Sequence, residues 1–339
     1  MRRQTDQPRP KSVAPRGPPI PEVDRLSLEE LPLGQVHRLK VNLLRDGVGR
    51  RVQVPVLVVR GVGKGPVLGV TAAVHGNELN GVPIIHRLVS KLSPHKLNGT
   101  LVAVPVVNVP GYLENRREYR DGADLNRLMP GKAVGSESQT YAYRFLNRVV
   151  HCFEYLVDLH TASFGRKNSL YVRVDLNEPV ACRMAGLIGA QIIVHNEGED
   201  GTLRAAAADL GVHAITVEVG DPNRFQTGLI RSSRLGLENI MEDLGMLARQ
   251  SNGEDEHEEA VVCDNSYWLY TDVGGVLQIS PKLADRVGKG EIIARVTDIY
   301  GTEIRSYEAP EVGIVVGMST NPVAHTGARI LHLGIERVG

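Results

Sequence analysis

The sequence predicts an α/β fold, a mainly parallel mixed sheet with helices on both faces, followed by a small C-terminal all-β domain. Nearly continuous apolar runs at 66–74 and 100–107 are typical of strands that are buried on both faces. Such runs alternate with helix-length amphipathic segments, which is the pattern of a parallel sheet with crossover helices. From residue 261 onward the sequence changes to short runs rich in glycine and valine, with little helical periodicity.

Periodicity and turn residues indicate the elements in chain order. Proline and charged residues dominate residues 1–24, so we expect a disordered leader there. The stretches 35–45 and 51–60, joined at RDGVGR, predict an antiparallel hairpin at one edge of the sheet. After the two buried runs, further strands are expected at 155–159, 191–194 and 213–219. Amphipathic segments predict helices over 78–92, 137–151, 178–189, 201–210 and 232–249.

A polar, acidic segment, SNGEDEHEEA, separates the α/β region from the rest of the chain. It predicts a linker over 250–260, between an α/β domain at 25–249 and a C-terminal β-domain at 261–339. In the last region, the runs GGVLQI, IIARVTD, IRSYEA and GIVVGM predict the strands of a small β-barrel or sandwich.

The charge balance argues against two classes of partner. The 339 residues carry 39 lysines and arginines against 39 aspartates and glutamates, so the formal net charge is zero. Without a broad basic field we expect no nucleic acid and no anionic membrane as a partner, although a local cationic pocket is compatible with this balance. The sequence has no run of about 18 apolar residues and no apolar signal segment, so we expect a cytoplasmic protein. A homo-oligomer is an option that the sequence leaves open.

The three cysteines, Cys152, Cys182 and Cys263, are far apart and form no CxxC pair. This spacing argues against a disulfide framework and against a cysteine-ligated metal site. We expect inert or buried thiols.

Polar side chains follow several predicted strands, at the sheet edge where open α/β sheets bind their ligands. His75 follows the strand at 66–74, in HGNE, and His160 follows the strand at 155–159, in DLHTAS. Glu218 lies near the end of the strand at 213–219, in VEVG. We therefore expect these three side chains to meet in one site.

A metal site is the chemistry that this set of residues favours. His75 and Glu78 are three residues apart at a strand-to-helix junction, so both side chains can point into one pocket. With His160 they form a His/Glu/His set, and catalytic zinc sites commonly use three such ligands and leave the fourth position to water. A histidine taken alone could equally be a capping or core residue, but convergence with Glu218 favours the metal.

Two other acidic residues near histidines have different interpretations. His151 and Glu154, in HCFE, repeat the HxxE spacing. They lie away from the sheet edge where ligands are expected to bind, so we assign them to the surface or to packing. Asp158 precedes His160 by two residues, so both side chains point to the same side of their strand. This carboxylate could orient the imidazole, or it could serve in a helix cap or salt bridge, and the sequence leaves both options open.

An arginine-rich segment, RREYRDGADLNR at 116–127, follows the strand at 100–107 and therefore begins at the same edge. Arginine binds a carboxylate through two parallel hydrogen bonds, which suits recognition of an acidic substrate group. A solvated charge cluster is the alternative interpretation. The placement of the loop favours a role in binding.

The motifs HGNE, NVPGY, RDGADLNRLMPG, DLHTAS and VEVG occur in this order over roughly 65–235. With them the sequence resembles the succinylglutamate desuccinylase/aspartoacylase family, within the zinc carboxypeptidase-like superfamily. The later region GGVLQISPKLADRVGKGEIIARVTD is similar to the C-terminal β-domain of that family, which itself resembles biotinyl/lipoyl carrier domains. No lysine stands in a carrier-type MKM context, so we do not expect lipoylation or biotinylation.

The resemblance implies that residues 25–249 form a zinc hydrolase catalytic domain with one Zn²⁺ per chain. It implies that His75, Glu78 and His160 are the zinc ligands and that Glu218 is the general base. In such a site, zinc lowers the pKa of its bound water and the base moves protons between water and leaving group.

The resemblance also implies the residues that recognise the substrate. Asn126 and Arg127 are expected to bind its carboxylate, and Arg117 is expected as a further substrate-binding arginine. Either Arg127 or the zinc ion would stabilise the tetrahedral oxyanion, so Arg127 is also expected to take part in catalysis.

We therefore expect zinc-dependent hydrolysis of the amide bond of an N-acyl amino acid or a related small metabolite that bears a carboxylate. A carboxypeptidase or amidase acting on a peptide or conjugated metabolite is the nearest alternative. A zinc-binding regulatory module without catalysis, or a protein that docks partners through its β-domain, is a further alternative. Glu218 argues against a mere binder, which has no need of a base beside the metal.

Overall fold

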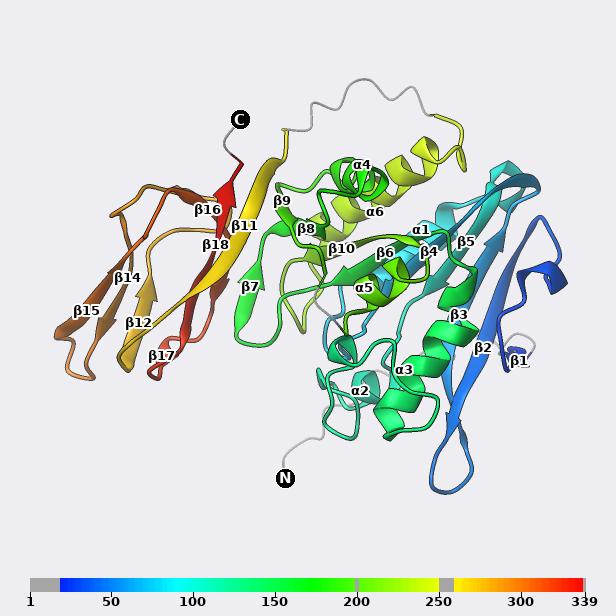
Figure 1. The fold of residues 1–339 in the computed structure, drawn as a ribbon, viewed down its shortest axis with the longest axis horizontal. Helices are drawn as coiled ribbons and strands as arrows, with labels where there is room; N and C mark the ends of the chain where they lie inside the picture. Colours follow the sequence, from blue (N-terminus) through cyan, green and yellow to red (C-terminus); the bar gives the residue numbers. More distant parts are fainter. Residues whose placement is uncertain (1–18, 199–200, 250–258, 338–339) are drawn as a thin grey trace, which may run out of the picture.

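The computed structural model describes residues 19–198, 201–249 and 259–337, and it has the predicted mixed α/β fold (Figure 1). One large sheet extends through this part of the chain. In spatial order its strands are β1 (Glu22–Val23), β2 (Gln35–Arg45), β3 (Arg51–Arg60), β5 (Asn98–Val104), β4 (Gly63–Ala72), β6 (Tyr155–His160), β10 (His213–Val219), β8 (Leu170–Val174), β9 (Ile192–His195), β11 (Val261–Tyr270), β18 (Arg329–Glu336), β16 (Gly313–Ser319) and β13 (Arg286–Val287), with β7 (Arg166–Asn168) paired to β16.

The predicted hairpin is confirmed with its predicted bounds, because β2 and β3 pair antiparallel along their whole length. At the edge of this hairpin, the short strand β1 pairs in parallel with β2. β1 falls within the predicted leader of 1–24, so the leader prediction does not hold for residues 22–23. Residues 1–18 lie outside the described residues.

The centre of the sheet is parallel, as the buried runs predict. β5, β4, β6 and β10 are parallel neighbours, and β8 adds antiparallel to β10. Both faces of these strands are buried: in β6, Leu156 belongs to the core on one face and Val157 to the core on the other. The carboxyl ends of β4, β6 and β10 therefore meet at one edge of the sheet.

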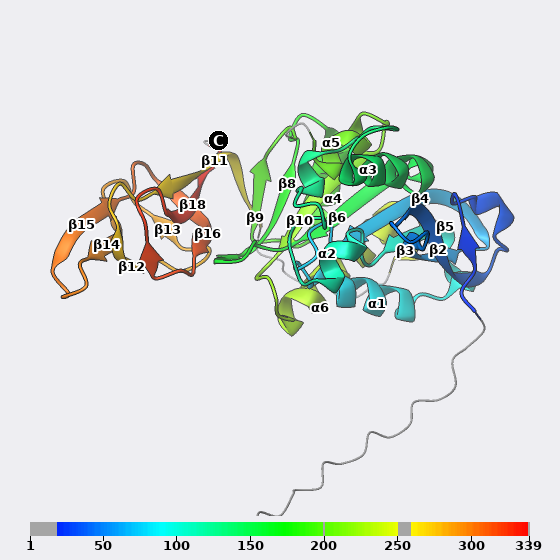
Figure 2. The ribbon, with the colours of Figure 1, turned by 90° about the horizontal axis from the view of Figure 1, so that it is seen from below.

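Helices cover both faces of the sheet (Figure 2). One layer consists of α1 (Gly81–Lys91), α4 (Pro179–Leu187) and α6 (Thr227–Asp243), which pack on the core that contains Val157. The other consists of α3 (Glu137–Arg148) and α5 (Leu203–Ala208). The short helices are η1 (Leu28–Glu30), η2 (Pro94–Lys96), α2 (Val109–Leu113), η3 (Leu125–Arg127) and η4 (Val150–Cys152).

Two differences from the predicted boundaries affect the candidate site. The helix expected at 78–92 begins at Gly81, so Glu78 lies on the turn before it. A Cβ at Gly81 would lie 2.5 Å from the Cβ of Ala72, so a glycine here lets α1 pack closely against β4. The strand expected at 155–159 extends by one residue and includes His160.

Besides the longer C-terminal strands β11 and β18, the sequence does not predict several short elements, among them α2, β7 and β8. They have five, three and five residues, too few to show a clear period in the sequence. β8 and β7 are important for the site, because they lead from the central sheet to the C-terminal strands.

The C-terminal region contains the predicted all-β structure. Its separate four-stranded sheet consists of β15 (Glu303–Glu308), β14 (Ile292–Thr297), β12 (Gly275–Ile279) and β17 (Val323–Ala324). This sheet shares an apolar core with β13, β16 and β18 of the large sheet. The region is also joined to the large sheet, because β11 pairs in parallel with β9 and β16 pairs with β7. Of the predicted linker at 250–260, residues 250–258 lie outside the described residues, so the domain boundaries stay a prediction.

Within the described residues, no helix is both long enough and apolar enough to cross a membrane.

Candidate functional site

His75 and Glu78 lie on a tight turn between β4 and α1. Ala73, directly after β4, has a φ of 50°, in the left-handed region that residues with a Cβ rarely adopt. The N–H of Glu78 donates to the carbonyl of His75 at 3.1 Å and closes the turn. A Cβ at Gly76 would lie 2.1 Å from the carbonyl carbon of Gly111, so only glycine fits there. The turn therefore holds both side chains at the carboxyl end of β4.

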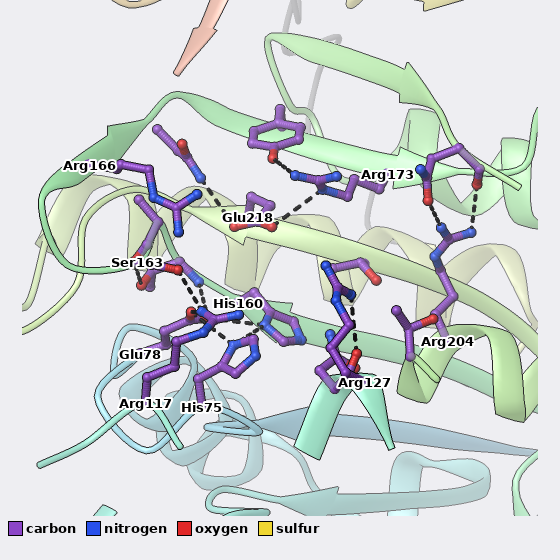
Figure 3. Close-up of a pocket in the computed structure, with 18 of the residues that line it drawn as sticks. His75, Glu78, Arg117, Arg127, His160, Ser163, Arg166, Arg173, Arg204 and Glu218 are labelled. Carbon is purple, nitrogen blue, oxygen red and sulfur yellow. Dashed lines mark hydrogen bonds and ion pairs between the residues drawn. The ribbon is translucent and has the colours of Figure 1, made fainter. Parts of the chain in front are cut away.

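The side chains of His75, Glu78 and His160 point toward one another in the pocket (Figure 3). One metal-binding atom from each residue lies within 4.8 Å of the other two, and all three residues are buried. Nδ1 of His75 is 2.9 Å from Oε1 of Glu78, and Nδ1 of His160 is 3.0 Å from Oε2 of the same carboxylate. The structure thus brings together the three residues that the sequence predicts as metal ligands.

The hydrogen bonds around this cluster fit a cation. Nε2 of His75 lies 3.1 Å from a carboxylate oxygen of Asp124, and Nε2 of His160 lies 2.7 Å from one of Asp158. A neutral imidazole carries one N–H, so if each Nε2 donates to its carboxylate, each Nδ1 presents a lone pair. The two Nδ1 atoms face each other at 3.2 Å, beside the carboxylate of Glu78. A divalent metal accepts electron pairs from such a set.

The electrostatics of the cluster keep its carboxylates ionised. Burial raises the pKa of Glu78, but the neighbouring imidazoles of His75 and His160 outweigh burial and hold this pKa well below its usual range. Burial also opposes ionisation of Asp124, but contacts with His75 and Arg117 lower its pKa. An ionised carboxylate is the state that a metal ion requires of its ligand.

Asp158 contacts His160 from within the sheet. The side chain is buried, one oxygen contacts Nε2 of His160, and the other accepts the hydroxyl hydrogen of Thr71 at 2.6 Å. Burial lowers the pKa of His160, but Asp158 and Glu78 outweigh this effect and raise it well above its usual value, so a metal ion at Nδ1 would have to displace a proton. Asp158 therefore contacts the imidazole ring and not a helix end, and its role in orienting the ring stays a prediction.

Glu218 stands opposite the cluster in the same pocket (Figure 3). On β10 it is the register partner of His160 on β6, so both side chains leave the sheet at the same level. Nδ2 of Asn168 donates to its Oε2 at 3.2 Å, and Nε of Arg173 lies 3.5 Å from its Oε1. These contacts hold the carboxylate toward the cavity.

Asn126 and Arg127 line the same cavity from η3. Asp124 caps this short helix by accepting the N–H of Asn126 at 2.9 Å. Oδ1 of Asn126 accepts the N–H of Leu203 at 2.8 Å, which ties η3 to the start of α5. Nη1 of Arg127 donates to the carbonyl of Asn126 at 3.2 Å. The predicted substrate-binding pair therefore lies beside the cluster.

Arg117 reaches the cluster from the loop after α2. Its Nη1 donates to Glu78 at 2.8 Å and to the hydroxyl of Ser163, and its Nη2 donates to Asp124 at 3.0 Å. Although burial opposes its charge, the two carboxylates raise the pKa of Arg117 above its usual value. The guanidinium group thus holds a predicted ligand and the carboxylate that contacts His75, so its role in substrate binding stays a prediction.

The second HxxE pair lies outside the pocket, as its position in the sequence suggests. Nε2 of His151 accepts a hydrogen bond from Nε of Arg25 at 3.2 Å, and Glu154 accepts the N–H of Val67 at 3.0 Å. Neither residue lines the cavity. Both therefore have packing roles at the surface.

The cavity measures about 260 Å³ and includes residues that the sequence analysis did not single out. Several of them come from β7, β8, the start of α5 and the C-terminal strands: Arg166, Asn168, Arg173, Arg204, Trp268 and Arg329. In the sequence, only their residue types could indicate a role in the site. The strand pairings that bring them to the cavity are not visible in any local sequence pattern. Asp124, which contacts His75 but does not line the cavity, is part of a quoted motif, and its contact depends on the loop conformation.

The sequence matches the model of the succinylglutamate desuccinylase/aspartoacylase catalytic domain over residues 64–244, more than half of the chain. The protein therefore belongs to the succinylglutamate desuccinylase/aspartoacylase family.

Individual relatives agree with this assignment. The chain is similar to an N-alpha-acetyl-L-2,4-diaminobutyric acid deacetylase from Halomonas elongata, at 24% identity over 275 residues, which cover 78% of this chain and 80% of that protein. The product-bound ectoine utilization protein from Ruegeria pomeroyi matches with a TM-score of 0.79 and 23% identity, over 90% of this chain and 98% of that one. A succinylglutamate desuccinylase from a Silicibacter species matches with a TM-score of 0.79 and 22% identity, over 91% and 98%. These structures share the fold, and the deacylases among the relatives support a hydrolase.

Proposed function

We propose that this protein is a zinc-dependent amidohydrolase that removes the acyl group from an N-acyl amino acid or a related small, carboxylate-bearing metabolite. One observation carries the proposal: two imidazole nitrogens and the carboxylate of Glu78 converge within 4.8 Å, and Glu218 is the register partner of one of these histidines. The family of deacylases to which the chain belongs supports the reaction class.

The proposed zinc ligands are His75, Glu78 and His160, with one ion per chain. The cluster offers two nitrogens and a carboxylate, the ligand types of catalytic zinc sites that leave one position open. When bound, zinc would supply Lewis acidity toward the scissile carbonyl and lower the pKa of water in the site. Asp124 and Asp158 would keep both rings in the orientation that presents Nδ1.

Glu218 is the proposed general base. Its carboxylate faces the cavity and is fixed by Asn168 and Arg173. It would take a proton from the attacking water and deliver it to the leaving nitrogen, so that the amide yields a carboxylic acid and an amine. Arg127 lines the same cavity and would stabilise the developing oxyanion or the substrate carboxylate.

The substrate class follows from the cationic lining near Asn126 and Arg127. A guanidinium group binds a carboxylate through two parallel hydrogen bonds, and η3 is fixed to α5 so that this group is presented from a rigid element. The relative from Halomonas elongata is named for an acetylated amino acid, a small molecule with a free carboxylate. We propose a substrate with the same kind of group.

A substrate screen tests the proposal. Zinc-loaded protein would be incubated with N-acetyl, N-succinyl and γ-glutamyl amino acids, and released amine would be measured beside the Glu218→Gln variant. Hydrolysis by the parent and not by the variant is expected. A protein that binds zinc tightly but hydrolyses none of these amides, nor short peptides, would overturn the proposal in favour of a regulatory module. Cleavage of peptides alone would indicate that the protein is a carboxypeptidase.

A further inference from the structure

One row of side chains crosses three strands of the central sheet beside the catalytic cavity. Glu218 on β10 pairs in register with His160 on β6 and, on its other side, with Tyr171 on β8. Register partners project from the same side of a sheet, so a proposed zinc ligand, the proposed base and Tyr171 stand side by side. All three residues line the cavity. The position of Tyr171 next to the base is therefore set by the backbone hydrogen bonds of the sheet.

Arg173 connects Tyr171 to the base. It follows Tyr171 by two residues on β8, so its side chain lies on the same side of the sheet. Its Nη2 donates to the hydroxyl oxygen of Tyr171 at 2.6 Å, and its central guanidinium carbon lies 5.4 Å from the centre of the tyrosine ring. Its Nε lies 3.5 Å from Oε1 of Glu218 (Figure 3). One planar group therefore contacts both the tyrosine and the base, each through a different nitrogen.

The hydroxyl group of Tyr171 stands at the end of a buried ring. The residue is 1% exposed, and it packs in an apolar cluster with Ile192 of β9, Cys263 of β11 and Val316 of β16. Burial raises the pKa of Tyr171 above its usual value, so the hydroxyl group stays neutral. A buried hydroxyl group needs a hydrogen-bond partner, and the guanidinium group of Arg173 is that partner. A phenylalanine would fill the same cluster, so the hydroxyl group points to a role beyond packing.

The C-terminal strands also hold Tyr171 in place. His332, on β18, is buried and packs edge to face against the tyrosine ring, with ring centres 6.2 Å apart. The same imidazole stacks on Trp268 of β11, with ring centres 5.3 Å apart and planes 11° from parallel. Aromatic pairs in such geometries stabilise their arrangement beyond the area that they bury. A change at His332 would therefore alter the position of Tyr171.

A general base acts well only when its carboxylate is held in one place, because a misplacement of about 1 Å can cost 10²-fold in rate. Asn168 donates to Oε2 of Glu218 at 3.2 Å and Arg173 contacts Oε1, so both oxygens have a partner. Arg173 is itself a long side chain with many rotamers, and the hydroxyl group and ring of Tyr171 restrain it. The order of the base therefore depends on the tyrosine.

We propose that Tyr171 is a positioning residue for the reaction: held by His332 of the C-terminal strands, its hydroxyl group fixes Arg173, and Arg173 fixes the carboxylate of Glu218. The inference rests on the proposed function, since it assigns Tyr171 to the base of that reaction. It also gives the C-terminal region a part in catalysis, because His332 and Trp268 support the base through Tyr171.

Tyr171→Phe tests the proposal, because it keeps the ring in its cluster and removes only the hydroxyl oxygen. With the amide that the substrate screen identifies, kcat should fall by about five- to tenfold, the effect of one lost hydrogen bond. KM and zinc content should stay within about twofold of the parental values, because neither the substrate contacts nor the ligands change. In the Glu218→Gln background, Tyr171→Phe should lower the residual rate no further, because the base through which Tyr171 acts is gone.

Tyr267→Phe is the matched control. Tyr267 lies on β11, outside the catalytic cavity, and its hydroxyl group donates to Glu311 at 2.6 Å. The substitution also removes one tyrosine hydrogen bond, but kcat should stay parental. His332→Ala should lower kcat as Tyr171→Phe does, and His332→Phe, which restores a ring against Tyr171, should recover most of the loss.

Crystal structures of the zinc-loaded parent and of Tyr171→Phe test the positioning without catalysis. The carboxylate of Glu218 should have one conformation in the parent and at least two in the variant. The proposal is overturned if kcat of Tyr171→Phe is parental, if Glu218 keeps its single conformation there, or if Tyr171→Phe slows the Glu218→Gln variant by the same factor as the parent. A parent that hydrolyses no amide, with Glu218 disordered by Tyr171→Phe, would instead contradict the proposed function and leave the positioning standing.

Discussion

Glu218 and His160 are register partners on two adjacent parallel strands, β10 and β6. Residues paired in this way project on the same side of the sheet, so the distance between the proposed base and a proposed ligand is set by backbone hydrogen bonds and not by a flexible loop. Asp158, two residues before His160 on the same strand, contacts the ring from behind. The sheet itself therefore holds the proposed ligand, its carboxylate partner and the proposed base in fixed relative positions.

The first prediction concerns the base. Glu218→Gln keeps the size of the side chain but removes its basicity, so hydrolysis should fall by about 10² or more while zinc content and fold are retained. Steady-state kinetics and metal analysis of the same preparation check this. The control is Glu303→Gln, an exposed carboxylate on β15, which should leave the rate unchanged. Parental activity in the Glu218 variant would show that another group moves the proton.

The second prediction concerns the metal ligands. His75→Ala or His160→Ala removes one of the converging nitrogens, so most of the bound zinc should be lost from purified protein that otherwise carries about one ion per chain. Elemental mass spectrometry of the purified variants measures their zinc content. His151→Ala, which changes the histidine of the second HxxE pair, should retain zinc fully. Full occupancy in both ligand variants would contradict the assignment.

The third prediction concerns the carboxylate behind His160. Asp158→Asn keeps the shape of the side chain but weakens the hydrogen bond that fixes the imidazole, so zinc affinity should fall by roughly 10–100-fold. Competition with a chelator gives the affinity. Asp264→Asn, at an exposed position of β11, serves as the control. An unchanged affinity would mean that packing alone orients the ring.

The fourth prediction concerns the stability of the protein against acid. Burial, followed by the charges of Arg173 and Arg166, lowers the pKa of His332 to about 3 from its usual 6.5, and its Nδ1 has no hydrogen-bond partner in the described residues. Below pH 6.5 the unfolded chain therefore binds a proton at this histidine, whereas the folded protein does not. The contribution of His332 to the free energy of unfolding is complete above pH 6.5 and is lost as the pH falls toward 3.

From pH 7 to pH 5 this one group should cost about 2 kcal/mol of unfolding free energy. In His332→Phe, which keeps a ring against Trp268, that part of the loss should disappear. Urea unfolding of parent and variant at pH 7, 6 and 5 measures the difference in slope. His86→Gln, at an exposed position of α1, should lose stability as the parent does. A parallel pH dependence in the His332 variant would contradict the prediction.

The sequence predicts the centre of this site well and its rim poorly, for a physical reason. His75, His160 and Glu218 stand at the ends of long apolar strands, and the parallel arrangement of such strands brings their ends together. Trp268 and Arg329 reach the cavity only through the pairings of β9 with β11 and of β7 with β16. β7 has three residues, and the C-terminal strands look like a separate domain, so no local pattern reveals these pairings.

The last prediction concerns carboxylate recognition by Arg127. A planar guanidinium group can bind a carboxylate through two parallel hydrogen bonds, and the ammonium group of lysine cannot reproduce this geometry. Arg127→Lys should therefore raise KM and lower kcat/KM by about tenfold or more, because a charge-assisted hydrogen bond contributes roughly 1.5–3 kcal/mol. Arg116→Lys, an exposed position in the same arginine-rich segment and outside the cavity, should leave both constants unchanged.

The substrate must be varied together with the residue. Amides of the same substrate that lack the free carboxylate should be poor for the parent and insensitive to Arg127→Lys, because the group that this arginine binds is gone. Zinc content is measured alongside, since Arg127 follows Asn126 on η3 and the loop also carries Asp124, which contacts His75. A parent enzyme that prefers the carboxylate-free amide would refute recognition by Arg127 and would indicate a general amidase.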